Sequence, residues 1–146
     1  AEKGFIIAGQ DTDGTVTPID LGMRWAVKNS ADFIGRRSLF RSDTARPDRR
    51  QLVGLLTEAP DVVLAEGAQI IAEPAERIGC IGRTPMIGHV TSSYMSPNLG
   101  RSIALALVEG GHGRTGDTVH VARRGATPIP ARIAGTDFLA REGDRP

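Results

Sequence analysis

Three histidines are the side chains of this 146-residue chain best suited to proton transfer or metal binding: His89, His112 and His120. A nucleophilic triad joins a histidine to a serine or cysteine and an acid, and a zinc site needs several ligands at characteristic spacing. None of the three histidines lies in such a motif. His89 and His120 fall in expected strands and His112 in a glycine-rich turn. We therefore expect structural roles for them, with no catalytic residue and no metal site.

Residues 9–15, GQDTDGT, are similar to the start of a calcium-binding loop, because Asp11, Asp13 and Thr15 occupy alternate positions. Such a loop needs a glutamate at its twelfth position, and counting from Asp11 this position is Gly22. We therefore expect an Asx-type turn, in which an aspartate side chain accepts hydrogen bonds from its neighbours, and no calcium site.

Cys80 is the single cysteine, so the chain can form no internal disulfide and has no CxxC redox or zinc motif. Its expected role is that of a small buried apolar residue. The surrounding GCIGRTPMIG, residues 79–88, has too few glycines, in the wrong order, for a dinucleotide or P-loop fingerprint.

Charge limits the possible partners. Eighteen basic and seventeen acidic residues give a net charge of +1, so nothing calls for nucleic acid or an anionic membrane as a partner. The tract from Arg36 to Arg50 holds six arginines and two aspartates. It could be a phosphate-binding strip, but no aromatic residue for base stacking follows Phe40, and a solvated connector is expected.

Composition and length place the chain among globular proteins with one domain, or with one small domain and part of another. Its length suits one ordinary domain, and 40% of the residues are hydrophobic without any apolar run as long as a membrane span. The first ten residues, AEKGFIIAGQ, show no basic segment followed by a long apolar stretch. We expect a cytoplasmic location.

Short β-branched and aliphatic runs dominate the chain from residue 51 onward. Gly, Pro or Asn separate them about every dozen residues, which is typical of antiparallel barrels. Residues 102–108, SIALALV, are apolar on both faces and predict a fully buried strand. We predict a mainly β (α+β) fold, a C-terminal six-stranded antiparallel β-barrel preceded by an irregular segment with short helices. The expected strands are 51–57, 68–72, 87–93, 102–108, 118–123 and 129–134.

The first 46 residues are rich in turns. Thr17 is the expected N-cap of a short helix, with Asp20 close to the capping-box position and Gly22 ending the helix after about one turn. Residues 23–28, MRWAVK, are expected to form a strand, and residues 32–41, DFIGRRSLFR, a second short helix.

Three stretches carry a resemblance to a known family: EKGFIIAGQDTDGTVTPIDLGMRWAVK, DFIGRRSL and GHVTSSYMSPNLGRSIALALV. In this order they resemble the C-terminal part of aminomethyltransferases of the glycine cleavage T-protein type. The first stretch and LGRSIALALV are closer still to the α subunits of heterotetrameric sarcosine oxidases, our leading identification. The chain departs from the T-protein pattern at Ser93-Tyr94 and in the longer stretch 72–86.

The resemblance implies an activity for a longer protein. Such oxidases demethylate sarcosine oxidatively at a flavin and pass the one-carbon unit to tetrahydrofolate. Flavin and NAD are expected in other parts of the complex, and the partners are the rest of the α subunit and the other oxidase subunits. Residues 1–46 are expected to be the C-terminal end of the folate-binding domain and residues 47–146 the C-terminal barrel domain.

The resemblance also supplies three candidate folate contacts. Glu2 falls on the acidic position of the family's E-x-G turn, and Phe138 and Arg141 lie in the tail DFLAREG, which resembles the end of the family's last strand. The hairpin VTSSYMSPNLG, residues 90–100, is expected to close the folate-binding body. Its Pro and Asn residues favour a turn.

We further expect the chain to be inactive alone, since very little of the family's catalytic machinery is present. We also expect a C-terminal fragment, because large apolar side chains of the first 46 residues would have little of their own to pack against. These are Phe5, Ile6, Ile7, Leu21, Trp25, Val27 and Phe33. Two alternatives remain: a stand-alone aminomethyltransferase-like folate-binding protein, and a ligand-free β-barrel interaction module. Binding of folate separates these two alternatives.

Overall fold

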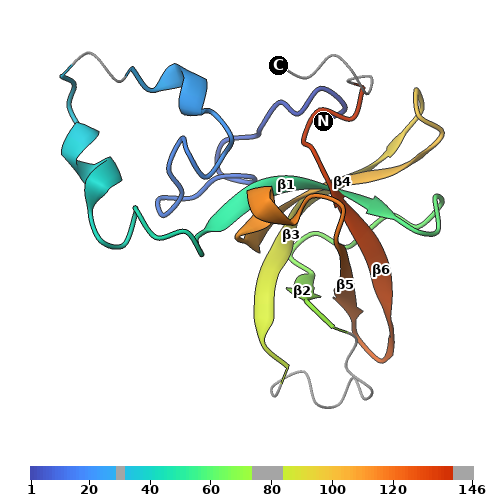
Figure 1. The fold of residues 1–146 in the computed structure, drawn as a ribbon. Coiled ribbons are helices and arrows are strands. Elements are labelled where there is room, and N and C mark those ends of the chain that lie inside the picture. Colours follow the sequence, from blue (N-terminus) through green and yellow to red (C-terminus); the bar gives the residue numbers. More distant parts are fainter. Residues whose placement is uncertain (29–31, 74–83, 140–146) are drawn as a thin grey trace.

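The computed structural model describes residues 1–28, 32–73 and 84–139. Its strands pair in the order β1-β4-β3-β2-β5-β6, and β6 pairs again with β1, so that the sheet closes into an antiparallel barrel (Figure 1). The predicted six-stranded barrel and mainly β fold are confirmed. The strands are β1 (Arg50–Thr57), β2 (Gln69–Ile71), β3 (Met86–Ser96), β4 (Arg101–Glu109), β5 (Thr118–Arg123) and β6 (Ala126–Ala134).

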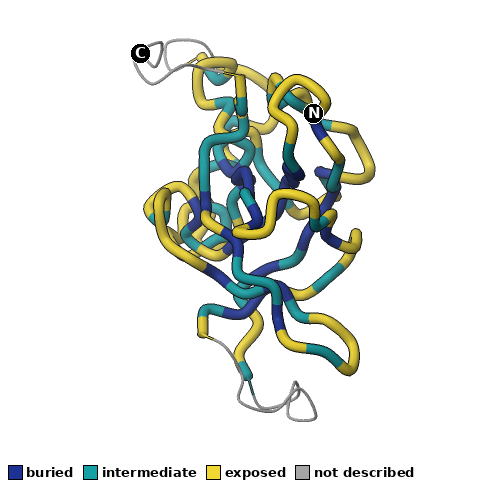
Figure 2. The backbone as a smooth tube through the Cα atoms, turned by 90° about the vertical axis from the view of Figure 1, so that its right-hand side faces the viewer, coloured by how far each residue is buried: buried dark blue, intermediate teal, exposed yellow. Residues whose placement is uncertain are grey.

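Strand β4 is buried on both faces, as its unbroken apolar sequence predicts. Ala104, Ala106 and Val108 belong to the cluster inside the barrel. Leu105 and Leu107 alternate with them and form a second cluster outside the barrel with Leu52 of β1. This outer cluster is covered by Ile6, Val16, Leu21 and Phe138. Buried positions accordingly gather along the strands, and exposed positions along the loops (Figure 2).

Strand β6 starts three residues earlier than predicted and contains Pro128 and Pro130. Proline lacks the N–H that a central strand donates, so it is confined to positions with one free side. Strand β6 pairs with β1 only from Ala131 to Ala134, whereas its pairing with β5 extends back to Ala126. The prolines therefore lie where β6 has a single neighbour.

The segment before β1 folds as a chain of turns that crosses the outside of the barrel. Thr17 and Asp20 form the predicted capping box: the Thr17 N–H donates to Oδ2 of Asp20 over 2.8 Å, and the Asp20 N–H donates to Oγ1 of Thr17 over 3.3 Å. Gly22 ends this turn with a φ of +74°. The capping prediction is confirmed, although the turn does not extend into a regular helix.

The strand predicted at 23–28 is wrong. Arg24–Ala26 forms the 3₁₀ helix η1, closed by hydrogen bonds such as that from the Val27 N–H to the Arg24 carbonyl. A strand needs a neighbour for its backbone groups, and none of the described residues pairs with this stretch. The helix predicted at 32–41 is shorter than expected, since η2 covers only Arg36–Phe40 and begins after Gly35, whose φ is +93°.

Residues 24–28 and 32–45, here called the arm, extend away from the barrel (Figure 1). Trp25, Ile34 and Phe40 expose 81%, 104% and 73% of their surface. The expectation of unpacked apolar side chains is met here and at Phe5, but it is wrong for the partly buried Ile6 and Leu21, which pack on the outer cluster. Within the described residues no helix is long and apolar enough to cross a membrane.

Candidate functional site

The tip of the β3–β4 hairpin presents a buried serine beside an exposed asparagine. Ser96, the last residue of β3, is 1% exposed, and its Oγ accepts a hydrogen bond from the Leu99 N–H over 3.0 Å. Asn98 lies in the turn, which Gly100 completes with a φ of +62°. The hairpin predicted from the Ser-Pro-Asn sequence is confirmed, and its polar tip faces the start of the chain.

The E-x-G turn lies directly against this tip. The Gly4 N–H donates to the Ala1 carbonyl over 2.8 Å, and Gly4 adopts a φ of +71°. A Cβ at Gly4 would lie 2.8 Å from the carbonyl oxygen of Thr136, so a larger residue would clash with the backbone after β6. Glycine is therefore required here for two independent reasons.

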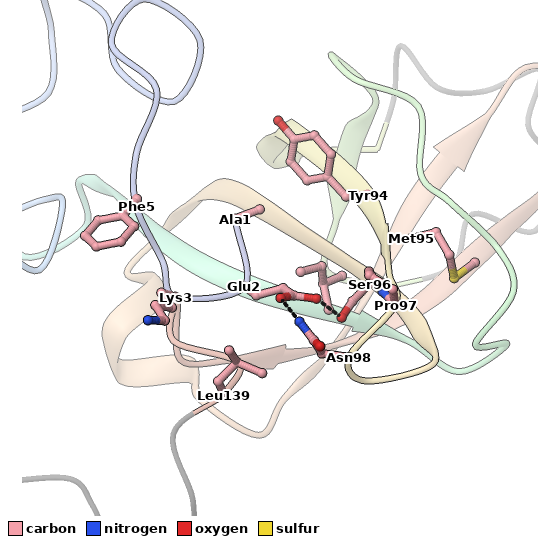
Figure 3. Close-up of a pocket in the computed structure, with 11 residues that line it drawn as sticks. Ala1, Glu2, Lys3, Phe5, Tyr94, Met95, Ser96, Pro97, Asn98 and Leu139 are labelled. Atoms are coloured by element: carbon pink, nitrogen blue, oxygen red, sulfur yellow. Dashed lines mark hydrogen bonds between the residues drawn. The ribbon is translucent and has the colours of Figure 1, made fainter.

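Both carboxylate oxygens of Glu2 are held by side chains of the hairpin tip. Oε1 accepts a hydrogen bond from the Ser96 hydroxyl, and Oε2 accepts one from Nδ2 of Asn98 over 2.6 Å (Figure 3). Hydrogen bonds from Ser96 and then Asn98 hold the pKa of Glu2 below its usual value, because they favour the charged carboxylate. Glu2 is thus an oriented, ionised acceptor.

This carboxylate faces a surface hollow of about 590 Å³. The hollow offers one acidic side chain, the basic Lys3, the polar tip of the hairpin and a mainly apolar wall. Such a site suits a ligand with N–H donors at one edge and an apolar body. The lining residues are Ala1, Glu2, Lys3, Phe5, Tyr94, Met95, Ser96, Pro97, Asn98, Ile103 and Leu139.

The three candidate folate contacts have different positions. Glu2 lines the hollow. Phe138 donates its N–H to the Glu2 carbonyl over 2.9 Å, while its ring packs in the outer cluster, against Gly54. A Cβ at Gly54 would lie 2.8 Å from this ring. Arg141 lies outside the described residues. A contact of any of these three residues with folate stays a prediction.

The histidines do not converge. His89 is half-buried on β3, and its pKa is lowered, first by burial and then by Arg50, with Asp13 opposing the shift. His112 is exposed and donates its backbone N–H to Gln51 over 2.8 Å. His120 alternates with buried valines of β5. Among the described residues no group of three or more His, Cys, Asp or Glu could hold a metal ion. Cys80 lies outside these residues.

The loop 9–15 is an Asx-type turn, as predicted, and it contains a buried acid that the sequence did not reveal. Oδ1 of Asp13 accepts hydrogen bonds from the Thr15 N–H and hydroxyl over 2.7 and 2.6 Å. Asp11 is only 1% exposed, and its Oδ1 accepts hydrogen bonds from Thr91 and Ser92 over 2.5 and 2.9 Å. The Asp11 carboxylate therefore binds β3 at its bulge.

The arginine-rich tract contains one buried ion pair. Nη2 of Arg49 lies 2.8 Å from Oδ2 of Asp20, and the two side chains expose only 11% and 4% of their surface. The hydrogen bond to Asp20 is the main cause of a raised pKa at Arg49. Arg46, by contrast, forms exposed pairs with Asp43 and Asp48. The expectation of a solvated connector holds for Arg46 and is wrong for Arg49, because the sequence did not show which arginine meets the buried Asp20.

The family model for the glycine cleavage T-protein C-terminal barrel domain matches residues 50–139, which contain all six strands. The chain belongs to this family. The resemblance inferred from the three motifs is thereby confirmed.

Longer proteins contain regions that are similar to this chain. The chain is 54% identical to the sarcosine oxidase subunit alpha of Corynebacterium sp. (strain P-1), a match that covers 82% of this chain and 12% of that subunit. It is 51% identical to the same subunit of Corynebacterium sp. (strain U-96), over 91% of this chain and 13% of that one. The chain thus spans about an eighth of the length of these relatives.

A solved structure shares the fold over nearly the whole chain. The crystal structure of the glycine cleavage system aminomethyltransferase T from Bartonella henselae superimposes with a TM-score of 0.75 at 25% sequence identity. The match covers 94% of this chain and 36% of that protein. The shared fold therefore includes the turns before β1 in addition to the barrel.

Proposed function

We propose that this chain is the C-terminal portion of a sarcosine oxidase α subunit, where it closes the folate-binding domain without being catalytic itself. The observation that carries the proposal is the Glu2 carboxylate, oriented by Ser96 and Asn98 at the edge of a hollow. The high identity to two sarcosine oxidase α subunits supports it.

The hollow is the proposed site for the pterin end of tetrahydrofolate. A carboxylate offers about four acceptor positions, and the hairpin uses only one hydrogen bond at each oxygen of Glu2. The remaining acceptors suit the neighbouring amino and ring N–H donors of a pterin. Phe138 and Arg141 complete the proposed set of folate contacts on the basis of the family resemblance.

The whole subunit would oxidise the N-methyl group of sarcosine at a flavin held outside this chain. A flavin there would supply the two-electron oxidation, and the one-carbon unit would pass to the amines of tetrahydrofolate to give methylene-tetrahydrofolate and glycine. NAD would likewise be bound elsewhere in the complex. The residues of this chain would hold and orient the folate.

The arm and Phe5 are the proposed contacts with the rest of the α subunit and with other oxidase subunits. Exposed apolar surface of this kind marks interaction sites, and Trp25, Ile34 and Phe40 are all more than 70% exposed. The proposed partners do not include nucleic acid or membrane, in keeping with the net charge of +1. We propose a cytoplasmic location.

The test uses the full-length polypeptide that carries this sequence, purified with its partner subunits. Sarcosine-dependent oxygen uptake is measured together with the one-carbon product. With tetrahydrofolate present, methylene-tetrahydrofolate is expected in place of free formaldehyde. Glu2→Gln should leave the rate of oxygen uptake unchanged and increase the share of formaldehyde. Absence of sarcosine-dependent oxygen uptake would refute the proposal.

The second candidate is a folate-dependent aminomethyltransferase, favoured by the superposition on the Bartonella henselae enzyme. Such a protein would bind tetrahydrofolate without consuming oxygen when sarcosine is added. A ligand-free interaction module would do neither. Titration with tetrahydrofolate, followed by the oxygen measurement, therefore separates the three possibilities.

A further inference from the structure

We propose that Ser96 and Asn98 are positioning residues that hold the Glu2 carboxylate in the orientation in which it binds a reduced folate. This inference rests on the proposed folate-binding function. It assigns a specific task to the tip of the β3–β4 hairpin, which contributes no nucleophile or general base of its own.

The hydrogen bonds at the tip have a defined direction. The Ser96 Oγ accepts a hydrogen bond from the Leu99 N–H, which leaves its hydroxyl proton to donate to Oε1 of Glu2. Asn98 donates from Nδ2 to the other oxygen. Because each oxygen has its own donor on a different side chain, the plane of the carboxylate is fixed as well as its position (Figure 3).

The hairpin that supplies these donors is anchored through the start of β4. Ser96 pairs with Arg101 across the hairpin. The Arg101 guanidinium donates through Nη2 to the Thr57 carbonyl over 2.5 Å, and the Ser102 N–H donates to the Pro60 carbonyl over 2.6 Å. The tip is therefore tied to the end of β1 and the loop after it. A site built on such an element holds its ligand-binding groups more accurately than a free loop does.

Without these donors, Glu2 would be a flexible side chain on a surface turn. Ordering a flexible side chain on binding costs affinity, and a carboxylate without hydrogen bonds is protonated more easily. The hairpin removes the first cost before the ligand arrives, and it lowers the pH at which protonation begins to matter. Loss of either donor should therefore weaken binding about three- to tenfold.

The experiment measures the dissociation constant of tetrahydrofolate for the full-length polypeptide with its partner subunits, under anaerobic conditions. Asn98→Ala and Ser96→Ala are expected to raise the constant about three- to tenfold. Asn98→Asp has nearly the same size as the native side chain but replaces the donor by a negative charge, so it should raise the constant further. Leu99→Ala is the matched control, since Leu99 lies in the same turn but outside the lining of the hollow and keeps its backbone N–H, and it should change the constant less than about twofold.

Two readouts distinguish positioning from a merely structural role. In a Glu2→Gln background, Asn98→Ala should add less than about a twofold effect, because its action passes through Glu2. In addition, the affinity of the Asn98→Ala protein should begin to fall at a higher pH than that of the wild type, as Glu2 takes up a proton more readily.

The outcomes separate the two proposals. Wild-type protein that does not bind tetrahydrofolate overturns the proposed function and this inference with it. Wild-type binding with an unaltered constant in the Ser96 and Asn98 variants overturns only the inference. An Asn98→Ala effect of equal size with and without the Glu2 carboxylate, or an unchanged pH profile, also overturns it.

Discussion

The side-chain amide of Asn98 donates to Oε2 of Glu2 over 2.6 Å although 96 residues separate them in the chain. This contact joins the first turn of the segment before the barrel to the tip of the β3–β4 hairpin. Asp11 and Asp20 make comparable contacts with Thr91 and with Arg49. The carboxylates of Glu2 and Asp11 thus attach the irregular segment to the barrel, and that of Asp20 holds the residue that precedes β1.

The titration of Glu2 tests the first contact. Its pKa in the folded chain should lie below the ordinary 4.5, because Ser96 and Asn98 stabilise the charged form. The corresponding stabilisation of the fold is present above the ordinary pKa and is lost as the pH falls through the lower, folded value. Carbon NMR of the Glu2 carboxyl measures this directly. Titration of the wild type at or above 4.5 would contradict the assignment, and Asn98→Ala should shift the pKa upward.

The buried pair of Asp20 and Arg49 should be the most sensitive ion pair to substitution. Arg49→Met leaves the Asp20 carboxylate buried without its cation, which should lower the free energy of unfolding by about 3 to 5 kcal/mol. Urea unfolding of the 146-residue chain measures the change. Arg46→Ala is the control, because Arg46 is 55% exposed and its pairs should contribute less than about 1 kcal/mol. Equal effects of the two substitutions would show that burial does not matter here.

Asp11 and Asp13, two residues apart on one loop, provide a second matched comparison. Asp11→Ala leaves the hydroxyls of Thr91 and Ser92 buried without their acceptor, at a cost of about 1 to 3 kcal/mol or more. Asp13→Ala removes hydrogen bonds only within an exposed turn and should cost about 0.5 kcal/mol or less. Thermal unfolding of both variants checks the order, and a larger effect at Asp13 would refute it.

The proposed burial of the arm can be followed through Trp25, the single tryptophan of the chain. At 81% exposure, its fluorescence in the isolated 146-residue chain should be quenched by iodide as readily as that of the urea-unfolded chain. The same measurement is made on the full-length polypeptide after any other tryptophan has been replaced, so that only Trp25 is observed. There, quenching should fall and emission should shift to shorter wavelengths, since the indole is covered by the partner surface. Unchanged quenching would exclude Trp25 from the interface.

Local sequence pattern predicted the barrel well. Each of the six expected strands is present, because alternation and unbroken apolar runs reflect which faces of a strand are buried, whatever its neighbour in the barrel. The capping box at Thr17 was predictable for a similar reason, since both partners lie within four residues. The hairpin turn at Pro97 and Asn98 was predictable as well, because proline and asparagine favour turns through their own local conformations.

The failures occurred where tertiary contacts decide. Residues 23–28 have a strand-like composition, but no described strand lies beside them and the backbone closes into η1. The sequence placed Asp11 and Asp13 in one turn, and only the fold distinguishes the buried Asp11 from the exposed Asp13. Among the arginines, only the position of Asp20 selects Arg49 as the buried partner.

The sequence by itself determined the barrel strands, the hairpin turn and the family, because these depend on neighbouring residues and on motifs. The tertiary structure alone decided that Ser96 and Asn98 hold the Glu2 carboxylate. The physical reason is that closure of the barrel fixes the hairpin tip in space, and the turns of the first segment bring Glu2 to it over a separation that no local pattern encodes.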